Sequence, residues 1–309
     1  MAATIREVYG NALVKYGKDD DRVVVLDADV SSSTKSNIFA QTSGERFFNV
    51  GIAEANMVAM AAGFASEGKI PFVNTFAVFI STLGTLGART FAGYGRAPIK
   101  FMGAYGGMSD AFDGATHHAI EDIAIMRAIP GITVLVASDA VLTDWIVKTA
   151  IETPAAMYVR LSRDTMPDLY RPDEKFELGK GKILKEGRDA TIIACGIMSG
   201  FSLEAAYILE KEGISVRVVD MFSIKPIDEA LIKQCARETK TILTAEEHSK
   251  IGGLGSAVAE VLAGNGLGTP LTMIGINDCY TQSGPYKDLL KAYELDVNSI
   301  ADKVKSCIR

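Results

Sequence analysis

The sequence is poor in the features that build disulfide frameworks, zinc sites and membrane spans. Its 309 residues contain four widely spaced cysteines and no CxxC pair. This pattern favours a reducing compartment over an oxidising one. No segment approaches the roughly 18 to 20 consecutive apolar residues of a transmembrane helix, and the first residues lack a signal-peptide pattern. We therefore expect a cytoplasmic protein with no membrane partner.

Blocks of one charge are also missing. The formal net charge is -6, and acidic and basic residues are interspersed along the chain. Without a Lys/Arg cluster to follow a phosphate backbone, nucleic acid is not an expected partner. Hydrophobic residues make up 48% and charged residues 23%, which is typical of a folded globular protein. The length favours about two domains of ordinary size.

Short apolar segments alternate with helical patterns almost from end to end. Near-continuous apolar strands separated by helices predict a parallel sheet covered on both faces. The polar segment 164–188 interrupts the alternation, which then resumes on a smaller scale. We therefore predict an α/β protein with two three-layer domains and mostly parallel sheets: a first domain at 1–166, a linker at 167–188 and a smaller domain at 189–309. The strand candidates are 23–29, 47–52, 70–76, 98–105, 133–138 and 156–162, then 190–196, 216–221, 241–247 and 271–276.

The strand ends of the first domain predict the position of a site. Ligands of such sheets bind beyond the carboxyl ends of parallel strands. Several of these ends carry polar or aromatic residues, namely Asp29 and Ser33, Glu54, Phe76 and Phe79, residues 113–118, and Arg163. Arg6 joins them only if the fold brings the N-terminal helix to the same edge.

Glu54, Phe76 and Phe79 each have two interpretations. Glu54 lies in the first turn of a helix rich in alanine and methionine. A carboxylate there either interacts with the helix dipole or is an acid in apolar surroundings that exchanges a proton with a ligand nitrogen. Phe76 and Phe79 share one face if their segment is helical. Core packing is the usual role of such rings, and sandwiching an aromatic ligand is the alternative.

Two glycine-rich turns precede predicted helices. The first contains His117 and His118, two of the three histidines in the chain. It is either a capping turn with Thr116 as the cap or part of a site; zinc is disfavoured, because adjacent histidines usually point apart and no third ligand lies at metal spacing. The second turn, GGLGS at 252–256, lacks the Lys-Ser/Thr ending of a nucleotide-binding loop, so close helix-to-strand packing is favoured.

Three motifs occur in a fixed order: NVGIAEANM, then DGATHHAIED followed by RAIPG, then LSRDTMP. Together they resemble the C-terminal half of transketolase, and the resemblance covers the whole chain. The same thiamine-diphosphate family includes deoxyxylulose phosphate synthase and the β subunits of 2-oxoacid dehydrogenases. The resemblance implies a pyrimidine-binding domain followed by a smaller transketolase C-terminal-like domain.

The resemblance also implies roles for individual residues. Glu54 matches the glutamate that hydrogen-bonds the pyrimidine N1′ of thiamine diphosphate and drives its tautomerism, and Glu54 and His117 are the expected catalytic residues. The cofactor-binding set is Glu54, Phe76, Phe79, Asp29 and Ile52. The substrate-binding set is Asp113 and His117, which contact sugar oxygens, and Arg163, Arg6 and Ser33, which hold a phosphate.

Three positions depart from the family pattern. Tyr105 stands where a histidine is expected upstream of Asp113, and His118 stands where glutamine is usual. Both lie on the substrate side and leave the exact sugar open. Thr82 stands where a third stacking ring is expected, which predicts a looser stack around the cofactor.

The family's GDG…N motif, which binds magnesium and diphosphate, does not occur in this sequence; the nearest match is FDG at 112–114. The start, MAATIREVYG, looks like a natural one. The resemblance therefore implies a split enzyme, whose N-terminal transketolase subunit binds the diphosphate and Mg²⁺ or Ca²⁺ while this chain binds no metal. We expect an α2β2 assembly in which this chain self-associates, shares thiamine diphosphate and moves a two-carbon ketol unit between phosphorylated sugars.

Two alternatives stay open. The segments EEHSKIGGLGSAVAE and KPID are also similar to deoxyxylulose phosphate synthase, which favours a related ketol transfer or decarboxylation. The other alternative is a non-catalytic assembly subunit. The combination of Glu54, Asp113, His117 and Arg163 argues against it, because a scaffold has no need of these residues.

Overall fold

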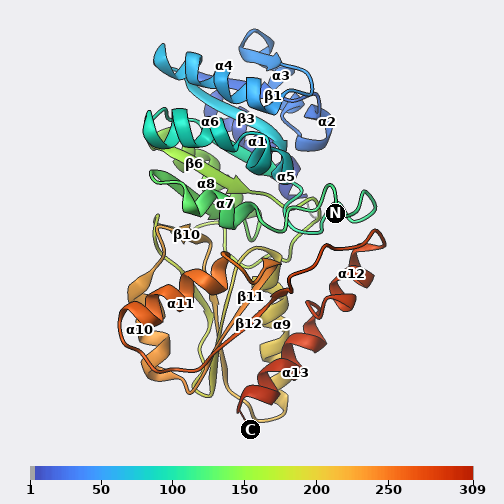
Figure 1. Ribbon diagram of the computed structural model, residues 1–309, viewed down its shortest axis with the longest axis vertical. Coiled ribbons are helices and arrows are strands. Elements are labelled where there is room, and N and C mark those ends of the chain that lie inside the picture. Colours follow the sequence, from blue (N-terminus) through green and yellow to red (C-terminus); the bar gives the residue numbers. More distant parts are fainter. Residues whose placement is uncertain (1–3, 309) are drawn as a thin grey trace.

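The computed structural model describes residues 4–308, which form two α/β domains stacked along the long axis of the molecule (Figure 1). The sheet of the first domain has the strand order β10-β5-β6-β4-β3-β1-β2. Its pairings are parallel except for β10 with β5. The strands are β1 (Val23–Asp27), β2 (Phe47–Asn49), β3 (Ile70–Phe76), β4 (Lys100–Ala104), β5 (Ile132–Val136), β6 (Ala156–Arg160) and β10 (Ser223–Lys225).

Both faces of this sheet are buried, which explains why its strands are apolar throughout. In β1, Val23 and Val25 pack into the core on one face, while Val24 and Leu26 pack into the core on the other. Helices α1 and α8 belong to the first core, and α4 and α7 to the second. The helices are α1 (Ile5–Gly17), α2 (Ser31–Thr34), α3 (Asn37–Ala40), α4 (Glu54–Ser66), α5 (Ala77–Thr82), α6 (Thr85–Gly87), α7 (Asp122–Ala128) and α8 (Ala140–Glu152), with a π-helical turn at Ala88–Tyr94.

The second domain repeats this arrangement with the strand order β12-β11-β8-β9-β7. Helices α9 and α13 pack together, as do α10 and α11. The strands are β7 (Lys182–Lys185), β8 (Ala190–Ala194), β9 (Val216–Asp220), β11 (Ile242–Ser249) and β12 (Leu271–Ile276). The helices are α9 (Ile197–Lys211), α10 (Glu229–Glu238), α11 (Leu254–Gly264), α12 (Tyr286–Ala292) and α13 (Val297–Ile308). Among residues 4–308, no helix combines the length and the apolar character needed to cross a membrane.

The predicted fold class is confirmed, because both sheets are mostly parallel and are covered by helices. Two strands, β7 and β10, were not predicted from the sequence. β7 lies inside the expected linker 167–188 and pairs antiparallel with β9. β10 follows β9 of the second domain but pairs antiparallel with β5 of the first sheet. Both are edge strands of three or four residues, too short to show a period of their own.

The GGLGS turn is explained by a carboxylate of the chain itself. Glu246 accepts hydrogen bonds from the backbone nitrogens of Leu254, at 2.7 Å, and Gly255, at 2.8 Å. It thus occupies the N-terminus of α11, where an anion is favourable. A Cβ atom on Gly253 would clash with the same carboxylate. The predicted close packing of helix and strand is confirmed.

Asp220, at the end of β9, joins the two domains and the segment between them. It is fully buried and accepts hydrogen bonds from the hydroxyls of Ser138, at 2.8 Å, Ser199, at 2.7 Å, and Tyr170, at 2.6 Å. Ser138 follows β5 of the first sheet, and Tyr170 lies between the domains. Burial raises the pKa of Asp220 to about 6.

The Asp220→Asn variant is expected to change how stability depends on pH. Because the pKa of Asp220 is raised from 3.8 to about 6 in the folded state, the folded protein binds more protons than the unfolded chain between these values. Rising pH through this window therefore destabilises the wild type. The difference in the free energy of unfolding, D220N minus wild type, should therefore increase between pH 3.8 and about 6. Denaturant titrations across the window measure this difference, and a constant difference would contradict the assignment.

Candidate active site

The site residues predicted from the sequence gather at one edge of the first sheet. β2, β1, β3, β4 and β6 pair parallel in this order, so their carboxyl ends lie on the same side. The residues that follow these ends are Ile52 and Glu54 after β2, Asp29 and Ser33 after β1, Phe76 and Phe79 at β3, residues 105–121 after β4, and Arg163 after β6. Arg6 approaches from α1, whose start is fixed by a capping box between Thr4 and Glu7.

Glu54 is buried although it begins a helix. Only 4% of its surface is exposed, and Oε1 accepts a hydrogen bond of 3.1 Å from the hydroxyl of Thr75. Thr75 precedes Phe76 at the end of β3. The carboxylate therefore lies in the first turn of α4, out of bulk water, and is bonded to the residue that precedes the first ring of the predicted stack. It meets the structural requirements of both interpretations, the dipole partner and the buried acid.

An aromatic cluster begins at Phe76, the residue after Thr75. The rings of Phe76 and Phe79 are nearly parallel, with centroids 5.9 Å apart and an angle of 22°. Tyr105 adds a third ring, 4.4 Å from Phe76, and His117 lies edge-on to Phe79 at 5.2 Å. Thr82, the expected position of the third ring, instead donates a hydrogen bond to a carbonyl of its own helix. The third ring of the cluster thus comes from the loop after β4.

Arg6, Ser33 and Arg163 meet at the same edge. Arg6 donates from Nε to the carbonyl of Arg163, at 3.1 Å, and from Nη1 to the carbonyl of Ser33, at 2.6 Å. Nη1 also donates to the hydroxyl of Tyr105 at 2.8 Å. The guanidinium carbons of Arg6 and Arg163 lie 4.9 Å and 5.2 Å from the centre of the Tyr105 ring. The fold therefore brings the predicted phosphate residues together around the tyrosine that replaces a histidine.

Asp110 belongs to this cluster and was missed by the sequence analysis. Its Oδ1 pairs with Nη1 of Arg163 at 2.9 Å. Burial, followed by the charge of Asp113, raises the pKa of Asp110 to about 6. The segment SDAFD contains both carboxylates, but the resemblance singled out only Asp113. The pairing depends on the path of the loop, which the sequence pattern does not reveal.

His117 and His118 lie on different sides of their loop. The His117 ring faces the aromatic cluster, and its Nδ1 is 3.0 Å from the hydroxyl of Thr116. His118 is 1% exposed, and its Nδ1 is 2.6 Å from the hydroxyl of Thr281 in the second domain. The capping interpretation is wrong, because α7 begins only at Asp122 and Thr116 does not cap it. His118 therefore contacts the second domain.

The remaining predicted cofactor residues lie on an open face. Asp29 is exposed and accepts a hydrogen bond of 2.8 Å from Asn49. The Ile52 side chain is 83% exposed, and Leu83 and Leu86, near α4, are 56% and 74% exposed. Within residues 4–308, these apolar side chains near the helix of Glu54 are thus left uncovered.

The edge combines a buried carboxylate, flat rings and two guanidinium groups. A flat heteroaromatic ring with a protonatable nitrogen fits the carboxylate and the rings. An anionic group fits the arginines. Among residues 4–308, no three His, Cys, Asp or Glu side chains are grouped to hold a metal ion.

Comparison with known families assigns both domains. Residues 1–168 match the pyrimidine-binding domain of transketolase, and residues 179–300 match the transketolase C-terminal domain. The chain therefore belongs to the transketolase family, as its motifs predicted. Within the family it corresponds to the C-terminal section, because it is 45% identical to a transketolase C-terminal section from Methanocaldococcus jannaschii. That match covers 97% of this chain and 95% of the relative.

Other relatives show how the chain relates to longer enzymes. It is 36% identical to a 6-deoxy-6-sulfo-D-fructose transketolase subunit of Clostridium sp., over 96% of this chain and 92% of the relative. Human transketolase is 37% identical over 98% of this chain, which spans only 49% of that enzyme. A solved structure described as a split-gene transketolase, inactive β4 tetramer, has a TM-score of 0.91 and 47% identity, with 98% of each chain covered.

The Tyr105→Phe variant tests the arginine cluster. It removes the hydroxyl that accepts a hydrogen bond from Arg6 but keeps the ring. Arg6 retains its two carbonyl acceptors. The free energy of unfolding should fall by about 1 kcal/mol, the usual net value of one hydrogen bond. Tyr94→Phe is the matched control, because Tyr94 is 90% exposed. Equal denaturation midpoints for the two variants would contradict the expectation.

Proposed function

We propose that this chain is the catalytic C-terminal subunit of a two-chain transketolase. The reaction transfers a two-carbon ketol unit from a ketose phosphate to an aldose phosphate. The observation that carries the proposal is the position of Glu54, a carboxylate with 4% exposure, bonded to Thr75 at the end of the strand that bears the stacked rings. The family resemblance requires this arrangement for the aminopyrimidine ring of thiamine diphosphate.

The residues at the sheet edge fit the pyrimidine half of that cofactor. Phe76 and Phe79 offer flat faces, and Glu54 would share a proton with the ring nitrogen N1′. Asp29 and Ile52 would border the cofactor on the open face. When bound, thiamine diphosphate supplies the nucleophilic carbon that attacks the sugar carbonyl. The chain's own part is to orient the ring and to hold the proton at Glu54.

The other half of the cluster fits an anionic sugar. Arg6 and Arg163 would bind the phosphate, with Ser33 beside them. Asp113 is exposed at the mouth of the site and would accept a hydrogen bond from a sugar hydroxyl. His117, between the aromatic rings and the loop, would hydrogen-bond the donor oxygens and exchange a proton with them. One relative is named for a sulfonated sugar, so phosphate and sulfonate donors should be assayed together.

The missing half of the site is proposed to come from an N-terminal transketolase subunit. That partner would bind the diphosphate and Mg²⁺ or Ca²⁺. The uncovered side chains of Ile52, Leu83 and Leu86 leave an apolar surface for a partner or a second copy. We propose an α2β2 assembly in which two copies of this chain pair. The similar structure described as an inactive β4 tetramer is consistent with a C-terminal chain that self-associates.

A synthase-like reaction is the main alternative, since EEHSKIGGLGSAVAE and KPID also resemble deoxyxylulose phosphate synthase. Ketose phosphates and pyruvate, assayed as donors with the partner present, separate the two. Turnover of ketose phosphates supports ketol transfer. Turnover of pyruvate as the donor, without turnover of ketose phosphates, supports the synthase-like reaction.

Glu54→Gln tests the catalytic assignment. Glutamine keeps the size and a hydrogen-bond acceptor for Thr75 but cannot hold the proton. Assembly with the partner should survive, while ketol transfer should fall by roughly 10²–10⁴-fold, the usual contribution of a positioned acid–base group. Glu67→Gln is the matched control, because Glu67 is exposed at the other end of the same helix. Unchanged turnover in E54Q would defeat the assignment.

Cofactor binding tests the division of labour between the chains. Calorimetry should show weak binding of thiamine diphosphate and magnesium to this chain alone, because the diphosphate and metal contacts belong to the partner. Binding should become tight when the N-terminal subunit is added. Tight binding to the isolated chain would rule out a shared site.

A further inference from the structure

The second domain directly contacts the loop that carries two of the proposed substrate residues. This loop, residues 105–121, joins β4 to α7 and contains Asp113 and His117. We call it the substrate loop. Its neck is closed by two hydrogen bonds between Gly107 and Ala119, at 3.1 Å and 2.9 Å. Its conformation decides where Asp113 and His117 lie relative to the sheet edge.

The end of β11 holds both sides of this neck. Oε1 of Glu247 accepts a hydrogen bond of 2.7 Å from the backbone nitrogen of Met108. The backbone nitrogen of Ser249 donates to the carbonyl of Ile120 at 2.8 Å. The residues before and after the loop tip are therefore fixed to one strand of the second domain.

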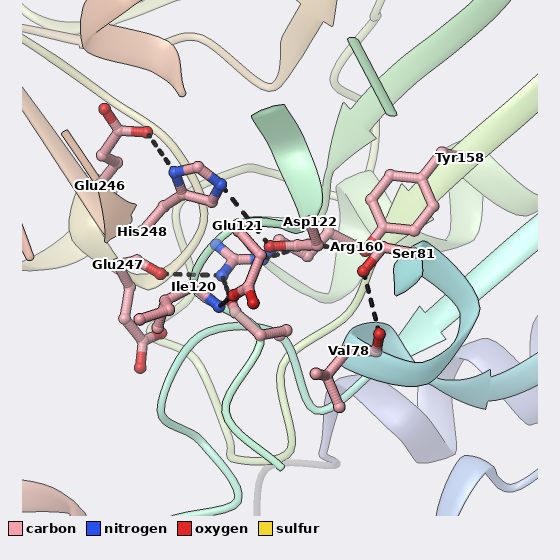
Figure 2. Close-up of polar contacts among 12 residues, drawn as sticks. Val78, Ser81, Ile120, Glu121, Asp122, Tyr158, Arg160, Glu246, Glu247 and His248 are labelled. Atoms are coloured by element: carbon pink, nitrogen blue, oxygen red, sulfur yellow. Dashed lines mark hydrogen bonds and ion pairs between the residues drawn. The ribbon is translucent and has the colours of Figure 1, made fainter. Parts of the chain in front are cut away.

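Arg160, the last residue of β6, contacts the same groups. It is 5% exposed, pairs with Asp122 at 3.0 Å, and donates to the carbonyls of Ala119, at 2.7 Å, and Glu247, at 2.8 Å. Figure 2 shows this guanidinium between the two domains. A buried guanidinium with these partners is costly to disturb. The neck of the substrate loop, the end of β6 and the end of β11 are thus connected by one set of buried polar contacts.

A second segment, which follows β12, reaches the tip of the loop. The hydroxyl of Thr281 lies 2.6 Å from Nδ1 of His118, and the backbone nitrogen of Gly284 donates to the carbonyl of Ala111 at 3.1 Å. His118 adjoins His117, and Ala111 lies two residues before Asp113. The immediate surroundings of both proposed substrate residues are therefore held by the second domain.

Two glycines of the loop show how close this fit is. Gly107 has a φ of 68° and Gly114 a φ of 77°, values that favour glycine. A Cβ atom on Gly107 would clash with the carboxylate of Glu247, and one on Gly114 would clash with the hydroxyl of Ser283. Side chains of the second domain thus occupy the space where side chains of the loop would otherwise lie.

We propose that Glu247 and Thr281 are positioning residues for the proposed ketol transfer. They hold the substrate loop in the conformation that presents Asp113 and His117 at the sheet edge. The second domain thereby takes part in substrate recognition, in addition to any role in assembly. This inference rests on the proposed function, because the loop matters to turnover only if a sugar binds there.

The first test is independent of activity and uses the full chain alone. Thr281→Val removes the hydroxyl that meets His118 with little change in shape. Hydrogen exchange of peptides covering residues 106–118 should become roughly two- to tenfold faster, the range expected from the loss of one hydrogen bond. Thr272→Val is the matched control, because the Thr272 hydroxyl contacts Cys307, at 3.4 Å, rather than the loop. Equal exchange in the two variants would overturn the proposal.

Glu247 variants separate positioning from general stability. Glu247→Gln keeps an acceptor for the Met108 nitrogen and should exchange at the wild-type rate. Glu247→Ala should accelerate exchange in the same peptides. If E247Q accelerates exchange as much as E247A does, the hydrogen bond to Met108 does not hold the loop.

The second test uses the chain assembled with its N-terminal subunit. T281V should raise the KM for the ketose phosphate donor about tenfold with a smaller change in kcat, while thiamine diphosphate binds as in wild type. A purely structural role would weaken cofactor binding as well. An unchanged KM in an active enzyme would contradict the proposal. If the wild-type assembly shows no ketol transfer, the proposed function fails, and the exchange experiment alone decides whether the second domain holds the loop.

Discussion

Parallel pairing of the strands in the first sheet is the constraint on which the site depends. Each parallel strand releases its following loop at the same edge, so residues far apart in sequence become neighbours. Arg6 and Arg163 are separated by 157 positions, yet the side chain of one bonds the backbone of the other at 3.1 Å. Glu54 follows β2 and Thr75 lies near the end of β3, yet their side chains are hydrogen-bonded at 3.1 Å across the intervening strand β1. An antiparallel arrangement would scatter these residues over two opposite edges.

This edge concentrates charge where water is scarce. Glu54 is buried, and burial raises the pKa of Asp110 to about 6 and that of Glu247, in the adjoining strand β11, to about 7. Buried carboxylates persist only with partners. The structure supplies a hydroxyl for Glu54, a guanidinium for Asp110 and a backbone nitrogen for Glu247. Burial is the main cause of the raised pKa values of Asp110 and Glu247.

The two domains contact each other at several points. β10 follows β9 of the second domain but completes the first sheet, and Asp220 bonds hydroxyls from both sides of the junction. Apolar residues of both domains belong to the same two cores. The substrate loop lies at this junction, so its shape depends on the second domain as well as on the strands it connects. Residue matches to a family locate such a loop but do not reveal what supports it.

The sequence by itself determined the alternation of strands and helices, the two-domain α/β class, the family and the strand ends that bear Glu54, Phe76 and Arg163. These follow from short-range patterns and motifs, which are legible along the chain. Only the tertiary structure decided that β7 and β10 are strands, that Asp110 pairs with Arg163, that Tyr105 completes the aromatic cluster and that His118 turns to Thr281. Each of these depends on a partner distant in sequence, and a contact between distant segments leaves no periodic or local signal in either one.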